Sequence, residues 1–198
     1  MGAIDEEKKK IRSEILKKRN SISPPDLLKN SEIICNYIMA GSKFIRATDV
    51  LLYSNYGSEV ITAKLCDKAL KDGKNVYYPK VEGEYISFYK VSSPSELNSG
   101  FMGILEPYGF DGKFNKSRDA IIIVPGSAFG RDGYRIGYGK GYYDKFLCRN
   151  LDIYKIGVCF DLQLLDRVPK DEHDIQLDEI ITEKCILTRS GKGEARWV

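Results

Sequence analysis

The feature that most constrains the fold is the most hydrophobic run of the sequence, Ala120-Ile-Ile-Ile-Val124, which ends abruptly at Pro125-Gly126. A strand with one solvated face alternates apolar and polar residues, whereas a continuous apolar run is typical of a strand buried on both faces. Such strands form the centre of parallel sheets, and ligands bind beyond their carboxyl ends. The run therefore predicts a central parallel strand followed by a ligand-binding loop.

The rest of the chain alternates between helical and strand periodicity. Apolar residues at helical spacing predict helices over 6–20, 26–40, 59–71 and 141–149, with Gly41 as a C-terminal cap of the second. Short apolar or alternating runs predict strands over 50–53, 75–79, 85–91, 154–160, 180–182 and 186–188. Residues 92–112 are rich in Ser, Gly and Pro, which predicts a loop with at most one short helix. The order of elements predicts an α/β fold.

Length and composition describe an ordinary globular protein. The 198 residues fit one domain over 1–198, and 42% hydrophobic with 30% charged residues is typical of a soluble chain. We find no apolar run near the roughly 20 residues of a membrane helix, and no secretory segment. We therefore expect a cytoplasmic protein that does not bind membranes, and we expect a monomer. The five scattered cysteines lack a Cys-x-x-Cys pair, so we interpret them as mostly buried thiols.

Positive charge is concentrated near the N-terminus. The net charge is only +3, but seven lysines and arginines lie between Lys8 and Arg19. This cluster either binds a polyanionic ligand or forms the solvated face of a helix, and composition alone favours the solvated face. Nucleic-acid binding is not expected, because domains of that class carry a larger basic excess.

A glycine-rich segment follows the central strand. Glycine permits sharp turns and close approach of the backbone, and free backbone N–H groups at a helix N-terminus attract phosphate. Arg135 and Lys140 add cationic side chains. The segment is not a Walker A motif, because Gly139-Lys140 precedes Gly141 instead of Ser or Thr, and its spacing is not that of a Rossmann fingerprint. Phosphate binding is favoured over a purely structural turn. The six glycines stand at 126, 130, 133, 137, 139 and 141.

Two carboxylates are candidates for a magnesium site. Asp144 lies one helical turn after Lys140, and Asp174 lies in the polar segment that begins at Pro169. Magnesium takes oxygen ligands from one or two carboxylates, with phosphate oxygens and waters completing the shell. The alternatives are an acid in the first turn of a helix for Asp144 and a cap or solvated loop for Asp174.

The remaining polar candidates are ambiguous on their own. His173 is the single histidine, so we expect a structural hydrogen-bonding role and no metal cluster of histidines. Tyr138, Tyr142 and Tyr143 can stack on a flat heterocycle, although tyrosines beside a helix start more often serve packing.

With these residues in view, the chain resembles the 5-formyltetrahydrofolate cyclo-ligase family. The segment Val124 to Asp144 follows the long motif of that family nearly position by position, and the similarity spans essentially the whole chain. The sequence departs from the family at Ile61, where an acidic residue is frequent, and at Ile136, where leucine is usual. Further matches lie at Tyr53-Ser54, Glu59-Val60, Thr62, Glu106-Pro107, Gln163, Pro169, Glu172-His173-Asp174 and 178–182.

The resemblance implies a fold and a set of site residues. The fold is a three-layer α/β sandwich with a mainly parallel central sheet flanked by helices. Asp144 and Asp174 match magnesium ligands, and Arg135, Lys140 and Tyr143 are the implied catalytic residues. The residues implied to bind the folate, which form the folate side of the site, are Tyr56, Glu59, Ile61, Gly137, Tyr138, Gly139 and Lys140. The implied ATP-binding residues are Lys8, Arg12, Arg135, Ile136, Gly137, Tyr138, Gly139, Lys140, Gly141, Tyr142 and Tyr143.

The resemblance also implies a reaction. ATP and Mg²⁺ would drive ring closure of 5-formyltetrahydrofolate, a small-molecule substrate expected in polyglutamylated form, to 5,10-methenyltetrahydrofolate. The formyl oxygen would be phosphorylated, N10 would close on the activated carbon, and phosphate would leave. Two rival hypotheses are a non-catalytic nucleotide or folate-binding regulator on the same fold and an RNA-binding protein that uses the basic N-terminal helix.

Overall fold

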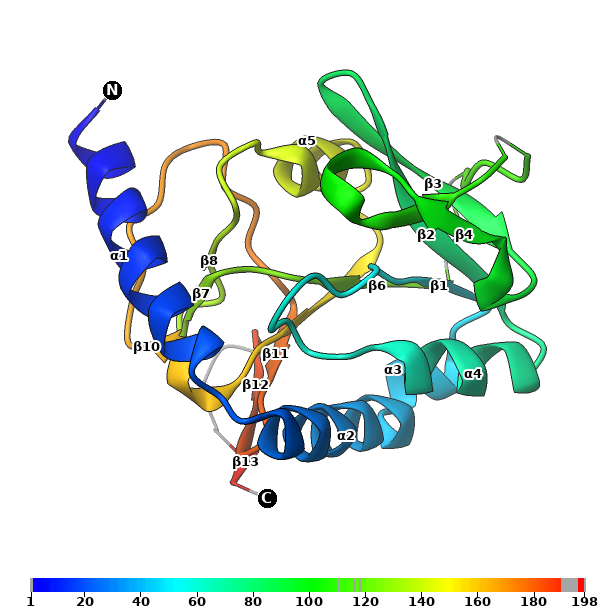
Figure 1. Cartoon of the computed structure of the whole chain (residues 1–198), viewed down its shortest axis with the longest axis horizontal. Helices are drawn as coiled ribbons and strands as arrows, with labels where there is room; N and C mark the ends of the chain where they lie inside the picture. The colour runs from blue at the N-terminus through cyan, green and yellow to red at the C-terminus, as the bar shows by residue number, and fades with distance from the viewer. Residues whose placement is uncertain (1, 110, 116, 118, 190–195, 198) are drawn as a thin grey trace.

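An eight-stranded mixed sheet runs through the middle of the protein (Figure 1). The computed structural model describes residues 2–109, 111–115, 117, 119–189 and 196–197. In spatial order the strands are β13-β12-β11-β9-β6-β1-β2-β3. Their bounds are β1 Asp49–Leu51, β2 Asn75–Glu82, β3 Tyr85–Val91, β6 Ala120–Val124, β9 Tyr154–Val158, β11 Glu179–Ile181, β12 Cys185–Thr188 and β13 Arg196–Trp197.

The predicted central strand is confirmed. β6 lies between β9 and β1 and pairs with both in parallel, and the parallel set extends to β11 on one side and β2 on the other. Antiparallel pairing occurs only toward the edges of this described sheet, at β2–β3, β11–β12 and β12–β13. The expectation of a mainly parallel central sheet is therefore correct.

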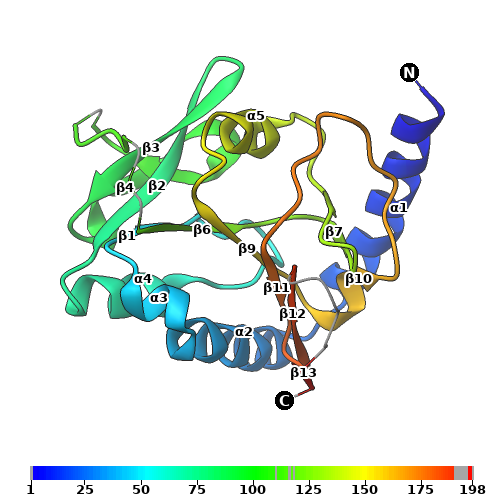
Figure 2. The ribbon, with the colours of Figure 1, turned by 180° about the vertical axis from the view of Figure 1, so that it is seen from behind.

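Helices cover both faces of the sheet, as the expected three-layer arrangement requires (Figures 1 and 2). α2 and α4 pack on one face with α3, and α5 lies on the other beside the β2–β3 hairpin. Alternate residues of β6 enter different cores: Ile121 and Ile123 face α2 and α4, whereas Ile122 and Val124 face α5. The helix bounds are α1 Ala3–Asn20, α2 Pro24–Ala40, α3 Ser42–Arg46, α4 Ala63–Lys71 and α5 Tyr142–Arg149.

Local signals set the limits of α2. The Ser23 hydroxyl accepts a hydrogen bond from the N–H of Asp26, and proline occupies the first helical position, where its missing N–H has no intrahelical partner to lose. Gly41 caps the C-terminus as predicted, but with a φ of −70° it is extended and not left-handed. From there the chain enters the short helix α3, which the sequence pattern did not predict.

The structure corrects three predicted elements. The helix predicted over 59–71 begins at Ala63, and Glu59 lies in the preceding loop. The strand β3 is mostly buried rather than half exposed, because α5 packs on it. The segment 92–112 contains more order than expected: after the 3₁₀ turn η1 (Pro94–Glu96), β4 (Leu97–Ser99) pairs antiparallel with β5 (Leu105–Pro107), and the 3₁₀ turn η2 (Phe101–Gly103) connects them.

A second small sheet leads from the carboxyl end of β6 into the glycine-rich segment. It consists of β7 (Ala128–Gly130) between β8 (Arg135–Ile136) and β10 (Leu164–Leu165), with the 3₁₀ turn η3 (Asp161–Gln163) before β10. The fully buried Gln163 amide donates to the carbonyl oxygens of Gly126 and Ser127. These bonds fix the turn that follows the central strand.

Four of the cysteines are buried, as expected, and Cys148 is exposed. Burial raises the pKa of the Cys35 thiol to about 12. None of the helices in the described part of the chain is long and apolar enough to cross a membrane.

A buried carboxylate fixes the amino-terminal edge of the parallel sheet. Asp49, 7% exposed, accepts hydrogen bonds from Thr48 Oγ1 at 2.7 Å, Ser117 Oγ at 2.7 Å, Tyr77 OH at 3.0 Å and Asn75 Nδ2 at 3.1 Å. Burial alone would raise the pKa of Asp49, but these bonds outweigh it and lower the pKa below its ordinary 3.8. The ionised carboxylate thereby joins β1, β2 and the chain before β6.

Replacing this carboxylate with an amide tests the interaction. Asp49→Asn should lower the free energy of unfolding by about 1–3 kcal/mol near neutral pH, because the amide NH₂ faces groups that donate. A group whose pKa is lowered in the folded state stabilises the fold fully above its ordinary pKa. That stabilisation is lost as the pH falls through the lowered pKa. The difference in the free energy of unfolding between Asp49→Asn and the parent, measured by urea denaturation, should therefore shrink at acid pH. The exposed Asp67→Asn is the control, and a deficit independent of pH would contradict the assignment.

Candidate active site

The loop between β8 and α5 is built from backbone. Gly139 and Gly141 adopt φ values of +102° and +65°, a region that strains residues with side chains, and Gly141 is the N-cap of α5. A Cβ added at Gly137 or Gly141 would meet no atom within 4 Å. The loop thus borders open space, with the backbone N–H groups of a helix start beside it.

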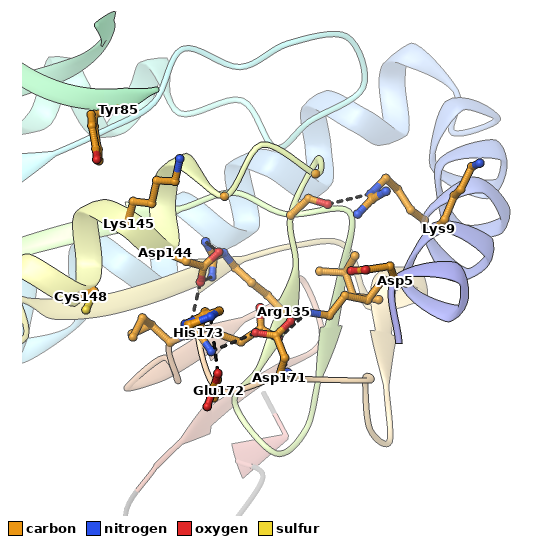
Figure 3. Close-up of a pocket in the computed structure, with 18 of the residues that line it drawn as sticks. Asp5, Lys9, Tyr85, Arg135, Asp144, Lys145, Cys148, Asp171, Glu172 and His173 are labelled. Atoms are coloured by element: carbon orange, nitrogen blue, oxygen red, sulfur yellow. Dashed lines mark hydrogen bonds and ion pairs between the residues drawn. The ribbon is translucent and has the colours of Figure 1, made fainter. Parts of the chain in front are cut away.

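One side of the loop forms a cavity of about 860 Å³ between α1 and α5, which we call the charged cavity. In Figure 3 Lys9 and Asp5 on α1 lie across from Lys145 on α5, and Arg135 lies between them. Carboxylates gather at the end formed by the 171–174 segment. The Asp, Glu, Lys and Arg residues that line the charged cavity are Asp5, Lys8, Lys9, Arg12, Arg135, Asp144, Lys145, Arg149, Asp171, Glu172 and Asp174.

Lys8 connects α1 to the acidic end of the charged cavity. Its Nζ lies 2.5 Å from Asp174 Oδ2 and 2.7 Å from Asp171 Oδ2. Partial burial would lower the pKa of Lys8, but the bonds to the two carboxylates outweigh it and raise the pKa above 10.5. The bond from Lys8 lowers the pKa of Asp171. The expected ATP-binding lysine and one expected magnesium ligand are therefore paired with each other.

Arg135 and Asp144 form a second pair, in which the arginine is buried and the carboxylate partly buried. The Arg135 side chain is 2% exposed, and its two terminal nitrogens bond both oxygens of Asp144 at 2.9 and 3.2 Å. Asp144 Oδ1 also accepts from the N–H of Ile175, so Asp144 lies against the segment that carries Asp174. Within the described residues Arg135 Nε is buried without a hydrogen-bond partner. Such an atom is rare in proteins and fits a ligand that accepts a hydrogen bond.

The other side of the loop forms a cavity of about 240 Å³, which we call the apolar cavity. Aromatic and aliphatic side chains dominate it, including Tyr53, Tyr143, Phe101, Met102 and Ile104. Arg135, Gly137, Gly141 and Asp144 line both cavities. The glycine-rich loop and its ion pair are thus a shared wall.

Polar groups of the apolar cavity meet at Glu59. Its carboxylate is 6% exposed and accepts from the Tyr138 hydroxyl and, at 2.8 Å, from the N–H of Tyr56. Burial raises the pKa of Glu59, and these hydrogen bonds oppose that rise only in part. Burial also raises the pKa of Tyr138 and Tyr143 above 10, so both hydroxyls are protonated at neutral pH.

The structure brings most of the expected residues together. Arg12 Nε donates to the carbonyl of Gly137 at 2.8 Å, which holds α1 against the loop. Lys140 is exposed, lines the apolar cavity and makes no hydrogen bond or ion pair with the described residues. Tyr142 and Tyr143 also line the apolar cavity. Ile136 is buried, so only its backbone is available to a ligand.

Two expectations fit the structure poorly. Ile61, expected on the folate side, lines neither cavity, because its N–H donates to Ser31 and its carbonyl accepts from Cys35, both in α2. The His173 side chain is 86% exposed and lies 3.7 Å from Glu172, which does not support the expected structural hydrogen-bonding role. Its ring instead borders the charged cavity (Figure 3).

Several lining residues escaped the sequence analysis. Tyr85 and Arg149 come from the β2–β3 hairpin and the end of α5, and the arginine lies 4.3 Å from the centre of the tyrosine ring. The Nζ of Lys145 also lies over the Tyr85 ring, 5.3 Å from its centre. No motif marks these positions, and only the packing of α5 on β3 brings them together. Lys9 was part of the predicted basic helix but was not singled out, and Asp5 lies before the predicted start of that helix at residue 6.

A metal site formed by protein alone is not present in the described part of the chain, where no group of three or more His, Cys, Asp or Glu side chains is suitably arranged. The N–H of Ile175, the residue after Asp174, donates to Asp144, so the two aspartates lie in adjoining segments. Two carboxylates fit a magnesium ion that takes its other ligands from phosphate and water.

Comparison with known proteins gives first the class of enzyme. The fold matches the solved 5,10-methenyltetrahydrofolate synthetase of Aquifex aeolicus with a TM-score of 0.83 and 36% identity over 93% of this chain and 94% of that chain. The synthetase of Mycoplasma pneumoniae matches with a TM-score of 0.73 and 25% identity, over 89% and 99% of the two chains. The protein therefore has the α/β fold of an enzyme of folate metabolism.

The family follows from the sequence comparisons. Residues 4–183 match the model of the 5-formyltetrahydrofolate cyclo-ligase family, and the chain belongs to that family. A Schizosaccharomyces pombe relative named "Probable 5-formyltetrahydrofolate cyclo-ligase" is 33% identical over 78% of this chain and 84% of its own length. The resemblance seen in the Val124 to Asp144 motif is thus confirmed.

Alanine substitutions at two glycines of the loop test whether a side chain is excluded by backbone strain or by lack of space. Gly139→Ala should lower the free energy of unfolding by about 1–3 kcal/mol, because its φ of +102° strains a residue with a Cβ. Gly137→Ala, whose Cβ meets nothing within 4 Å, should stay within about 0.5 kcal/mol of the parent. Urea denaturation measures both, and equal stability of the two variants would contradict the described loop conformation.

Proposed function

We propose that the chain catalyses the ATP- and Mg²⁺-dependent cyclisation of 5-formyltetrahydrofolate to 5,10-methenyltetrahydrofolate, with release of ADP and phosphate. The observation that carries this proposal is the shared wall, which separates a charged cavity from an apolar one by little more than glycine backbone. Phosphoryl transfer to a folate requires a polyanion and a flat heterocycle to meet, and binding both at one loop supplies that proximity. Membership of the cyclo-ligase family supports the choice of substrate.

The charged cavity suits a magnesium-bound nucleotide. ATP would supply the phosphoryl group that turns the formyl oxygen into a leaving group. Lys8 and Arg12 line this cavity from α1 and are the proposed phosphate-binding side chains, and the backbone N–H groups at the start of α5 offer further donors. The buried Nε of Arg135 adds a donor that has no partner among the described residues. A lining with both cations and carboxylates fits phosphate plus a divalent ion better than a bare anion.

Asp144 and Asp174 are the proposed magnesium ligands. A bound Mg²⁺ would neutralise charge on the phosphate oxygens. Each carboxylate is paired with a cation of the same cavity, Arg135 for Asp144 and Lys8 for Asp174. In the proposed complex both cations would contact phosphate oxygens while the carboxylates face the metal.

The apolar cavity is the proposed folate side. Tyr56, Glu59, Tyr138 and Lys140 line it, and the aromatic surfaces can stack on a pterin. Lys140, on the loop between the cavities, is the proposed clamp for the transferring phosphate. Tyr143 is proposed to relay a proton; its raised pKa means that it starts as a donor.

Three further expectations are also proposals. The substrate is proposed to be polyglutamylated and the enzyme to be monomeric. A cytoplasmic location is proposed as well, although a relative from Arabidopsis thaliana carries a mitochondrial name.

Turnover measured by absorbance of the methenyl product tests the central proposal. Product should form from 5-formyltetrahydrofolate only with both ATP and Mg²⁺. Lys140→Ala should reduce turnover on the order of 10²-fold while the protein stays folded, because an electrostatic clamp is lost from the transition state. The exposed Lys64→Ala is the control. Binding of both ligands without product would instead support the non-catalytic regulator.

A magnesium titration tests the proposed ligands. Asp174→Asn should raise the Mg²⁺ concentration for half-maximal activity on the order of 10-fold, because a neutral amide binds Mg²⁺ more weakly than a carboxylate. Asp144→Asn should do the same, but it also leaves buried Arg135 without its ion pair, so folding is checked by circular dichroism. Unchanged titrations in both folded variants would rule out ligation by these carboxylates.

A further inference from the structure

Arg19, in the last turn of α1, is almost fully buried although it lines neither cavity. It is 4% exposed, Nη1 donates to the Tyr138 hydroxyl at 2.8 Å and Nε donates to Ser58 Oγ at 3.0 Å. Burying a charged guanidinium costs on the order of several kcal/mol unless hydrogen-bond partners compensate for the lost water. Both partners belong to segments that border the apolar cavity.

The hydrogen bonds from Arg19 have a fixed direction. A guanidinium can only donate, so the Tyr138 oxygen accepts from Arg19 and its own proton is directed to Glu59. Glu59 then accepts from Tyr138 through one oxygen and from the N–H of Tyr56 through the other. The chain of donors ends on the carboxylate, which is therefore held as an acceptor facing the cavity.

Ser58 extends the same arrangement. Its hydroxyl accepts from Arg19 and donates to the side-chain oxygen of Asn20 at 2.5 Å, so the end of α1 holds the 56–59 segment as well as the loop. Arg19 thus holds Tyr138 directly, and it holds the segment of Glu59 through Ser58. On the same helix Arg12 holds the Gly137 carbonyl, one residue earlier in the loop.

We propose that Arg19 is a positioning residue of the folate side: it orients the Tyr138 hydroxyl and thereby holds Glu59 as an ionised acceptor for N–H donors of the pterin ring. The inference rests on the proposed function, which assigns the apolar cavity to the folate. It adds a residue that touches neither ligand and acts through its hydrogen bond to Tyr138 and through its charge on Glu59.

The charge of Arg19 reinforces its geometry. Groups that face Glu59 are Tyr53 after β1, Tyr138 in the loop, Tyr143 in α5 and Arg19 in α1. The tyrosines are neutral near pH 7, because burial raises their pKa. Among the described residues the cation that stabilises the Glu59 carboxylate is Arg19, against a burial that raises the pKa of Glu59. Without Arg19 that pKa would rise further.

The experiment compares Arg19→Met and Arg19→Lys with the parent protein. The methionine variant should bind 5-formyltetrahydrofolate on the order of 10-fold more weakly by fluorescence titration, because two hydrogen bonds from a charged donor are lost. Its KM for ATP should change less than about 2-fold, in contrast to the loss of a phosphate ligand. The acid limb of folate binding should move to higher pH. Lysine keeps the charge but not both bonds, so it should restore the acid limb and only part of the affinity.

A double-mutant cycle tests whether Arg19 acts through Tyr138. In a Tyr138→Phe background, Arg19→Met should cost little more, because the hydroxyl that it orients is already gone. Additive effects, or an acid limb that stays in place in folded Arg19→Met protein, would overturn the inference. The exposed Arg46→Met is the matched control. Failure of the parent to bind the folate would refute the proposed function itself, whereas parent binding with an unaffected Arg19→Met refutes only the role of Arg19.

Discussion

The site depends on the buried ion pair between Arg135 and Asp144. It joins the two sides of the glycine-rich loop, since Arg135 lies in β8 before the loop and Asp144 in the first turn of α5 after it. Breaking a buried pair of this kind costs about 3–5 kcal/mol, because one charge is left uncompensated. Through the N–H of Ile175 the same carboxylate also holds the 171–175 segment. One interaction therefore sets the relative positions of a strand, a helix and an acidic loop.

Much of the fold was predictable because burial leaves a clear pattern. The run 120–124 identified the central strand, and the alternation of its side chains between two cores explains why no polar residue interrupts it. The limits of elements were less predictable where tertiary contacts decide them. Glu59 carries no local signal that excludes a helix, yet its hydrogen bonds to Tyr138 and Tyr56 hold it in a loop. The pairing of β4 with β5 is likewise a tertiary outcome.

The basic N-terminal helix shows what a charge pattern leaves open. Composition favoured a solvated face, and Lys10, Lys17 and Lys18 are indeed exposed. Lys8, Arg12 and Arg19 instead reach carboxylates, a carbonyl and a tyrosine in segments more than 35 residues away along the chain. Sequence similarity predicted Lys8 and Arg12 as ligand-binding positions, whereas Arg19 emerged only from its burial. Residues such as Tyr85 and Arg149 gave no signal, because their proximity arises from the packing of α5 against β3.

The shared wall of glycine backbone has a consequence for how the protein can diverge. Gly137 and Gly141 line both cavities, so under the proposed function a side chain introduced at either position would alter the recognition of both proposed ligands in a single mutational step. Affinity for each ligand can be adjusted separately only at positions away from the wall, on α1 for one cavity and on the 97–107 hairpin for the other. We therefore expect natural variation in substrate preference to accumulate in those two peripheral elements while the loop itself stays constant.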